Sequence, residues 1–109
     1  MPLIYHLVPR PVWEKAAGAA YEADSLAAEG FIHCSHAGQV ARSANRFYAD
    51  ADELLLLHID PGRLTSPLRD EPAGSGESFP HVYGPINRDA VVAVRPLARG
   101  PDGRWVFDP

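Results

Sequence analysis

The stretch EGFIHCSHAGQVARSAN, residues 29–45, decides how this chain is organised. Its apolar start, Phe31-Ile32, predicts a short strand, and apolar residues further on recur at helical spacing. Such a strand-to-helix junction exposes free backbone N–H groups and the positive end of a helix dipole. We therefore interpret it as one wall of a ligand site. Four reactive side chains stand in a row at this junction: His33, Cys34, Ser35 and His36.

Strand alternation and helix capping separate these four side chains. Neighbouring residues on a strand point to opposite faces, so a His33 that faces a cleft leaves Cys34 facing the core. Ser35 suits the N-cap of a helix over residues 36–48, although Gly38 three residues on leaves its capping box incomplete. We interpret Cys34 as a buried structural thiol. A nucleophilic cysteine is the alternative, because a nearby helix N-terminus lowers a thiol pKa.

Outside this stretch, short apolar segments alternate with turns. The segment 53–59 contains four consecutive leucines and predicts a strand that is buried on both faces. A helix is predicted from Pro11 through VWEKAAGAAY, and a helical turn over residues 26–29 closes at Gly30. The order favours an α+β fold rather than regular βαβ alternation. We expect a small, twisted, mainly antiparallel β-sheet with two main helices packed on it.

Composition limits the class of protein. The 109 residues are 46% hydrophobic, which suits a single domain, residues 1–109, with its own core. A net charge of −4, scattered arginines and one lysine argue against an extended nucleic-acid surface. The N-terminus does not resemble a signal peptide, no apolar run could span a membrane, and one cysteine permits no internal disulfide. We expect a cytoplasmic protein without membrane contact.

Three of the five histidines lie on or beside predicted strands, next to an aromatic residue or a turn. They are His6 in IYHL, His33 in FIHC and His81 in FPHVYG. If these strands are neighbours, the three imidazoles converge on one cleft. Imidazole suits ribose hydroxyls, phosphates and proton transfer near neutral pH. We predict these histidines as the catalytic candidates; the alternative is that each is a core histidine bonded to backbone.

Further residues complete the predicted cleft. The loop PAGSGES, residues 72–78, directly precedes FPHVYG and is expected to cover the site. It is not a phosphate-binding P-loop, because it lacks the GK[ST] ending. Glu77 is the carboxylate closest in sequence to FPHVYG, and Glu71 is an alternative. We expect no metal, since His33 and His36 straddle a strand–helix boundary without regular ligand spacing.

Five stretches together resemble a bacterial family catalogued as domain of unknown function 952: IYHLVPRPVWEKA, SLAAEGFIHCSHAGQVARSANRFYA, DELLLLHIDPGRL, ESFPHVYGPI and DAVVAVRPL. The resemblance covers nearly the whole chain, and GFIHCS and FPHVYGP are its most specific parts. It implies an ADP-ribosyltransferase-like fold, in which the nicotinamide end of NAD binds between the halves of a split sheet. By position, His6 resembles the first motif of that superfamily, and His33 with Ser35 resembles the second. The segment with Glu77 and His81 resembles the third, although no glutamate lies on that strand itself.

The resemblance implies a cytoplasmic ADP-ribosyltransferase-like domain that binds NAD or a related nucleotide in a histidine-lined cleft. Catalysis would be attack at the nicotinamide ribose, or removal of a phosphate through an ADP-ribosylated intermediate. Two alternatives stay open: a non-catalytic small-ligand-binding domain, and a metal-dependent hydrolase built on His33, His36 and His81. The expected cofactor contacts are Tyr5, His6, His33, Ser35, Glu77, His81 and Tyr83.

Overall fold

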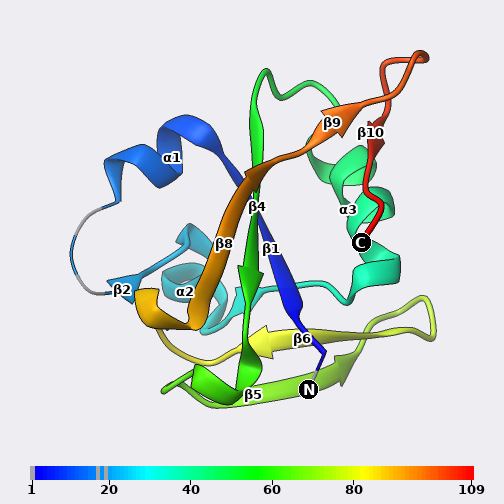
Figure 1. Ribbon diagram of the computed structural model, residues 1–109. Coiled ribbons are helices and arrows are strands. Elements are labelled where there is room, and N and C mark those ends of the chain that lie inside the picture. The colour runs from blue at the N-terminus through cyan, green and yellow to red at the C-terminus, as the bar shows by residue number, and fades with distance from the viewer. Residues whose placement is uncertain (1, 17, 19) are drawn as a thin grey trace.

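The computed structural model describes residues 2–16, 18 and 20–109, and two three-stranded antiparallel sheets form its frame (Figure 1). The first sheet has the order β1-β4-β8, with β1 at Ile4–Pro9, β4 at Leu54–Ile59 and β8 at Val91–Pro96. The second has the order β3-β6-β5, with β3 at Ile32–His33, β6 at Ser78–Val82 and β5 at Leu68–Pro72. Backbone hydrogen bonds of 2.9 and 2.7 Å between Tyr5 and Ser35 join them.

Shorter elements close the two ends of this frame. The strand β2 (Ala20–Tyr21) pairs with β7 (Ile86–Asn87), and β9 (Ala98–Arg99) pairs with β10 (Trp105–Val106). The helices are α1 (Arg10–Lys15), α2 (Asp24–Glu29) and α3 (Val40–Phe47), with 3-10 turns at Ala37–Gln39, Pro61–Arg63 and Arg88–Ala90. No helix within the described ranges is long and apolar enough to cross a membrane.

The central strand β4 is buried on both faces, as its leucine run predicted. Leu55, Leu57 and Ile59 belong to one hydrophobic cluster, whereas Leu54 and Leu56 belong to another. In Figure 1, β4 crosses the middle of the molecule between β1 and β8. The α+β fold with antiparallel sheets is therefore confirmed, and the sequence signal came from a strand that is apolar on both sides.

The first helix is shorter than predicted. It ends at Lys15, and residues 20–21, which the sequence assigned to the same helix, form β2 instead. Tyr21 is buried there and pairs with Ile86, so a tertiary contact overrides the helical preference of the alanine-rich segment. Residues 17 and 19 of that segment lie outside the described residues.

Ser35 is not the N-cap that the sequence suggested. Its backbone is used in the bridge to Tyr5, and the following turn begins one residue later, with His36 at the N-cap. The N–H of His36 donates to Oε1 of Gln39 at 2.9 Å. The capping arrangement that looked incomplete from Ser35 is therefore formed between His36 and Gln39.

Asn45 attaches the C-terminal hairpin to helix α3. The N–H of Trp105 donates to Asn45 Oδ1 at 2.8 Å, and Asn45 Nδ2 donates to the carbonyl of Trp105 at 2.9 Å. We expect Asn45→Ala to lower the free energy of unfolding by about 2 kcal/mol, because it leaves polar groups of a buried residue unpaired. Urea denaturation measures the loss, and the exposed Arg46→Ala on the same helix is the control. Equal losses in both variants would contradict this role.

Candidate functional site

The register of the second sheet brings His33 and His81 side by side. His33 pairs with His81, and His81 pairs with Arg69, so one row of side chains crosses β3, β6 and β5. Cross-strand partners point to the same face and lie about 5 Å apart. The centroids of the two imidazole rings are 5.3 Å apart. The residues next to them in sequence, Ile32 and Val82, are fully buried, so the histidine row occupies the opposite, outer face.

Each imidazole of this pair is held by a carboxylate. His81 Nδ1 donates to Glu71 Oε1 at 2.8 Å, and His33 Nε2 donates to Glu29 Oε2 at 2.9 Å. The hydroxyl of Tyr83 donates to the same Glu71 oxygen. Because Nδ1 of His81 carries the donated hydrogen, its Nε2 keeps the lone pair that can accept a proton or a hydrogen bond.

Hydrogen bonding also sets the charge of Glu71. The bond from the Tyr83 hydroxyl, and next the bond from His81, lower the pKa of the Glu71 carboxyl. The same bond to Glu71 raises the pKa of the Tyr83 phenol. At neutral pH Glu71 is therefore ionised and Tyr83 protonated. An ionised carboxylate only accepts hydrogen bonds, which holds His81 in the tautomer with hydrogen on Nδ1.

Phe31 supplies a flat apolar surface beside the histidines. Its ring stacks on His81 with centroids 4.1 Å apart and 21° between the planes. It also meets the edge of His33 at 4.8 Å and lies 5.4 Å from the ring of Tyr83. We call this surface the histidine face; its residues are Glu29, Phe31, His33, Arg69, Glu71, His81 and Tyr83. Stacking, hydrogen-bond donation and acceptance are all available on it.

His6 lies beneath this face. It is 7% exposed; its Nδ1 donates to the carbonyl of His33 at 2.7 Å, and its Nε2 accepts from the Tyr21 hydroxyl at 3.0 Å. Burial lowers the pKa of His6 to about 4, so the ring is neutral at neutral pH. The imidazole of His6 therefore meets the backbone of His33, and it supports the strand that carries the exposed ring of His33.

Tyr5 and Ser35 lie at the junction of the two sheets. The Tyr5 ring packs in the second hydrophobic cluster, 5.0 Å from His58 and 5.1 Å from Phe107. Ser35 is buried, and its backbone bonds to Tyr5. Neither residue belongs to the histidine face, although their bridge holds β3 against β1.

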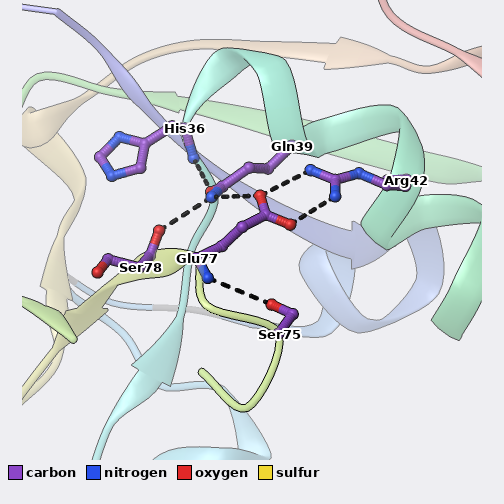
Figure 2. A network of polar contacts seen from close by, with 6 residues as sticks. All are labelled: His36, Gln39, Arg42, Ser75, Glu77 and Ser78. Atoms are coloured by element: carbon purple, nitrogen blue, oxygen red, sulfur yellow. Dashed lines mark hydrogen bonds and ion pairs between the residues drawn. The ribbon is translucent and has the colours of Figure 1, made fainter. Parts of the chain in front are cut away.

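Glu77 is bound to helix α3 (Figure 2). Both oxygens of its carboxylate accept from the guanidinium of Arg42, and Gln39 Nε2 donates to it at 3.3 Å. The bond from Arg42 lowers the pKa of Glu77. His81 is four positions further along an extended strand, about 13 Å away. The carboxylate that reaches His81 is therefore Glu71, the alternative from the sequence.

The loop predicted to cover the site forms the tip of the β5–β6 hairpin. Strand β5 continues to Pro72, and the N–H of Ala73 donates to the carbonyl of Glu77 at 2.7 Å. The Glu77 contacts bind this tip to α3 (Figure 2). The hairpin therefore serves to fix β5 and β6 relative to the helix.

The cysteine and the metal hypotheses can also be compared with the structure. Cys34 is buried, and burial raises the pKa of its thiol to about 12, which confirms the interpretation as a structural cysteine. His36 donates to Asp70 at 2.7 Å, away from the pair formed by His33 and His81. Within residues 2–16, 18 and 20–109, no group of three or more His, Cys, Asp or Glu side chains is arranged to hold a metal ion.

Two surface hollows lie away from the histidine face. One, of about 530 Å³, lies between α1 and the β4–β8 pair, and the other, of about 260 Å³, adjoins β9 and β10. Neither is lined by His33 or His81. The histidine face is open instead, since the side chain of His33 is 54% exposed. The first hollow is lined by Arg10, Trp13, Glu14, Ala16, Leu55, Arg88, Val94 and Pro96.

Sequence reasoning missed Arg69 and Glu29 at this face. Arg69 and Glu71 alternate along β5, and His81 in β6 and Tyr83 just after it have the same spacing of two, so each pair points to one side of its strand. That period of two is visible in the sequence. The pairing of β5 with β6, however, depends on a register that no local pattern specifies.

Known proteins resemble this chain over most of its length. A family model described as "Protein of unknown function (DUF952)" matches residues 7–94. A crystal structure of protein CC0527 from Caulobacter crescentus is 30% identical, has a TM-score of 0.85, and is matched over 95% of this chain and 93% of that chain. A solution NMR structure of CC0527 is 32% identical, with a TM-score of 0.79 over 95% of this chain and 91% of that chain. The search of curated proteins found no match.

Proposed function

We propose that this chain, which belongs to the DUF952 family of proteins of unknown function, binds NAD or a related nucleotide on the histidine face. One observation carries the proposal: His81 is held by Glu71, stacked on Phe31 and placed 5.3 Å from the ring of His33. An aromatic surface, an imidazole acceptor and carboxylate acceptors can bind the base and the ribose of a nucleotide. We propose the cytoplasm as its location.

The base and the ribose of a nucleotide each have matching groups on this face. A base or nicotinamide ring can stack beside Phe31, since aromatic side chains bind flat heterocycles through their π-surfaces. Ribose hydroxyls can donate to Glu29 or Glu71, because an ionised carboxylate has several acceptor positions and here each spends only one oxygen on its histidine. The lone pair on Nε2 of His81 can accept from a ribose hydroxyl or an amide N–H of the ligand.

The proposed chemistry is that of an ADP-ribosyltransferase-like enzyme, which the sequence resemblance implies. The bond between C1′ of the ribose and the nicotinamide nitrogen breaks, and nicotinamide leaves with the electron pair. A nucleophile forms the new bond to C1′ and gives its proton to Nε2 of His81. The carboxylate of Glu71 faces the positive charge that develops on the ribose. His6 contributes by holding the backbone of His33.

A non-catalytic binding domain is the second candidate. The observation that favours it is the exposure of the site: the His33 side chain is 54% exposed, so water reaches a ligand bound beside it. Enzymes that transfer glycosyl groups to acceptors other than water exclude water from the reacting centre. Release of nicotinamide from NAD separates the two candidates.

Binding of NAD and ADP-ribose, measured by calorimetry, tests the proposal. We expect His81→Gln to weaken the binding of both ligands about tenfold, because the imidazole ring that stacks on Phe31 and its acceptor nitrogen Nε2 are lost. The control is His36→Gln, which removes an imidazole that is also bonded to a carboxylate but lies outside the histidine face. No binding by the wild type at millimolar concentration, or equal losses in both variants, would reject the proposed function.

A further inference from the structure

We propose that Arg69 anchors an anionic group on the histidine face, so that the preferred ligand carries a phosphate and lies with that phosphate toward β5. The inference deepens the proposed function and rests on it for the identity of the ligand. Its own observation is the position of Arg69, at the β5 end of the row that also contains His81 and His33.

The contacts of Arg69 leave its hydrogen-bond donors available. Its guanidinium carbon lies 5.4 Å from the centroid of the Tyr83 ring, and the side chain is exposed. Among the described residues, no carboxylate lies within ion-pair distance of Arg69, whereas Arg10 and Arg42 each form ion pairs. The ring of Tyr83 orients the guanidinium without using its N–H groups.

The neighbouring groups make Arg69 the source of positive charge on this face. Glu29 and Glu71 are the carboxylates there, and each accepts a hydrogen bond from a histidine. Arg69 contributes to the lowered pKa of Glu71 through its charge, after the hydrogen bonds from Tyr83 and His81. An anion on this face is therefore attracted to the guanidinium, whose planar fork can bind two phosphate oxygens at once.

The order of His33, His81 and Arg69 along the row also predicts how the ligand is oriented. Three adjacent strands span about 10 Å from first to last, which is close to the length of a nucleoside monophosphate from base to phosphate. With the phosphate at Arg69, the base reaches Phe31 and His33 at the β3 end. Glu71 then lies beside the ribose. A nucleoside without phosphate keeps the stacking contact and loses the anchor.

The experiment compares AMP, adenosine and inorganic pyrophosphate as ligands of the wild type and of two variants. We expect Arg69→Gln to weaken binding of AMP and pyrophosphate about tenfold and to leave adenosine binding unchanged. Arg95→Gln is the control, because Arg95 is also an exposed strand arginine and lies on β8, outside this face. Calorimetry measures the affinities, and the imidazole NMR signals of His33 and His81 report where each ligand binds.

The outcomes separate this inference from the proposed function. Binding of pyrophosphate that depends on Arg69, with no binding of AMP or NAD, would reject the nucleotide proposal and support the anion anchor. Nucleotide binding that Arg69→Gln leaves unchanged would support the proposed function and overturn the anchor. The anchor is also overturned if Arg69→Gln weakens adenosine as much as AMP, or if pyrophosphate does not bind at millimolar concentration.

Discussion

Acidification from about pH 6.5 to about pH 4 is expected to lower the free energy of unfolding by about 3 kcal/mol through His6 alone. In the folded protein burial lowers the pKa of His6 from 6.5 to about 4, although its bond to the His33 carbonyl acts in the opposite direction. Between these values the unfolded chain binds a proton that the folded chain does not. Stability therefore falls as the pH falls through this window, and it is fully retained above it.

The structural reason is that both nitrogens of His6 are already used. Nδ1 donates to the carbonyl of His33, and Nε2 accepts from Tyr21. A second proton on the ring would place a charge in the core and would turn the acceptor into a donor facing the Tyr21 hydroxyl. Protonation of His6 is also expected to disturb the histidine face, since His6 holds the backbone of His33.

Urea denaturation of the wild type and of His6→Gln at about pH 7 and about pH 4 measures this effect. Glutamine does not titrate, so the variant should lose less stability between the two values. His58→Gln is the control, because burial, and next the charge of Arg95, also lower the pKa of His58. The pKa values of Glu71 and Glu77 are lowered from 4.5, so their contribution to stability is lost as the pH falls below about 4.5, and this loss is common to all three proteins. The same acid loss in His6→Gln as in the wild type would contradict the prediction.

The second large effect is expected for Gly84→Ala, which should lower the free energy of unfolding by about 3 kcal/mol. Gly84 has φ +153°, and a Cβ added to it would lie 2.4 Å from Ser66 Oγ and 2.9 Å from Ser66 Cβ. Alanine would therefore meet backbone strain and a steric clash together. Ser66 cannot easily turn away, because its hydroxyl donates to the carbonyl of Pro85 at 2.7 Å.

This glycine matters for the candidate site as well as for stability. It follows Tyr83 directly, and the segment that it touches, at Ser66, leads into β5. The close approach holds β5 next to the end of β6, where Glu71 meets His81 and Tyr83. We expect Gly84→Ala to weaken ligand binding together with stability.

Thermal and urea unfolding of Gly84→Ala measure the loss. Gly74→Ala is the matched control, since Gly74 lies at the hairpin tip, has no positive φ and leaves open space for a Cβ. That variant should stay within about 0.5 kcal/mol of the wild type. A Gly84→Ala protein as stable as the Gly74→Ala protein would show that the contact with Ser66 relaxes without cost.

Sequence patterns predicted the structure correctly where the pattern lies within a single strand or turn and does not depend on its neighbours. The leucine run of β4 predicts burial on both faces whatever its neighbours are, and Gly30 ends α2 with φ 89° as its position in the sequence suggested. The alternation of His33 with Cys34 likewise predicted a buried thiol. The segment after Lys15 failed because pairing of Tyr21 with Ile86 outweighed helix propensity.

The sequence by itself determined the α+β class, the buried strand at the centre, and His33 and His81 as residues worth testing. Only the tertiary structure decided which groups meet them: Arg69 and Glu71 instead of Glu77, with His6 beneath the face. The physical reason is that side-chain period is a local property, whereas register comes from pairing between strands far apart in the chain. Moving β5 by one residue against β6 would place Asp70 opposite His81 and turn Arg69 and Glu71 to the other face.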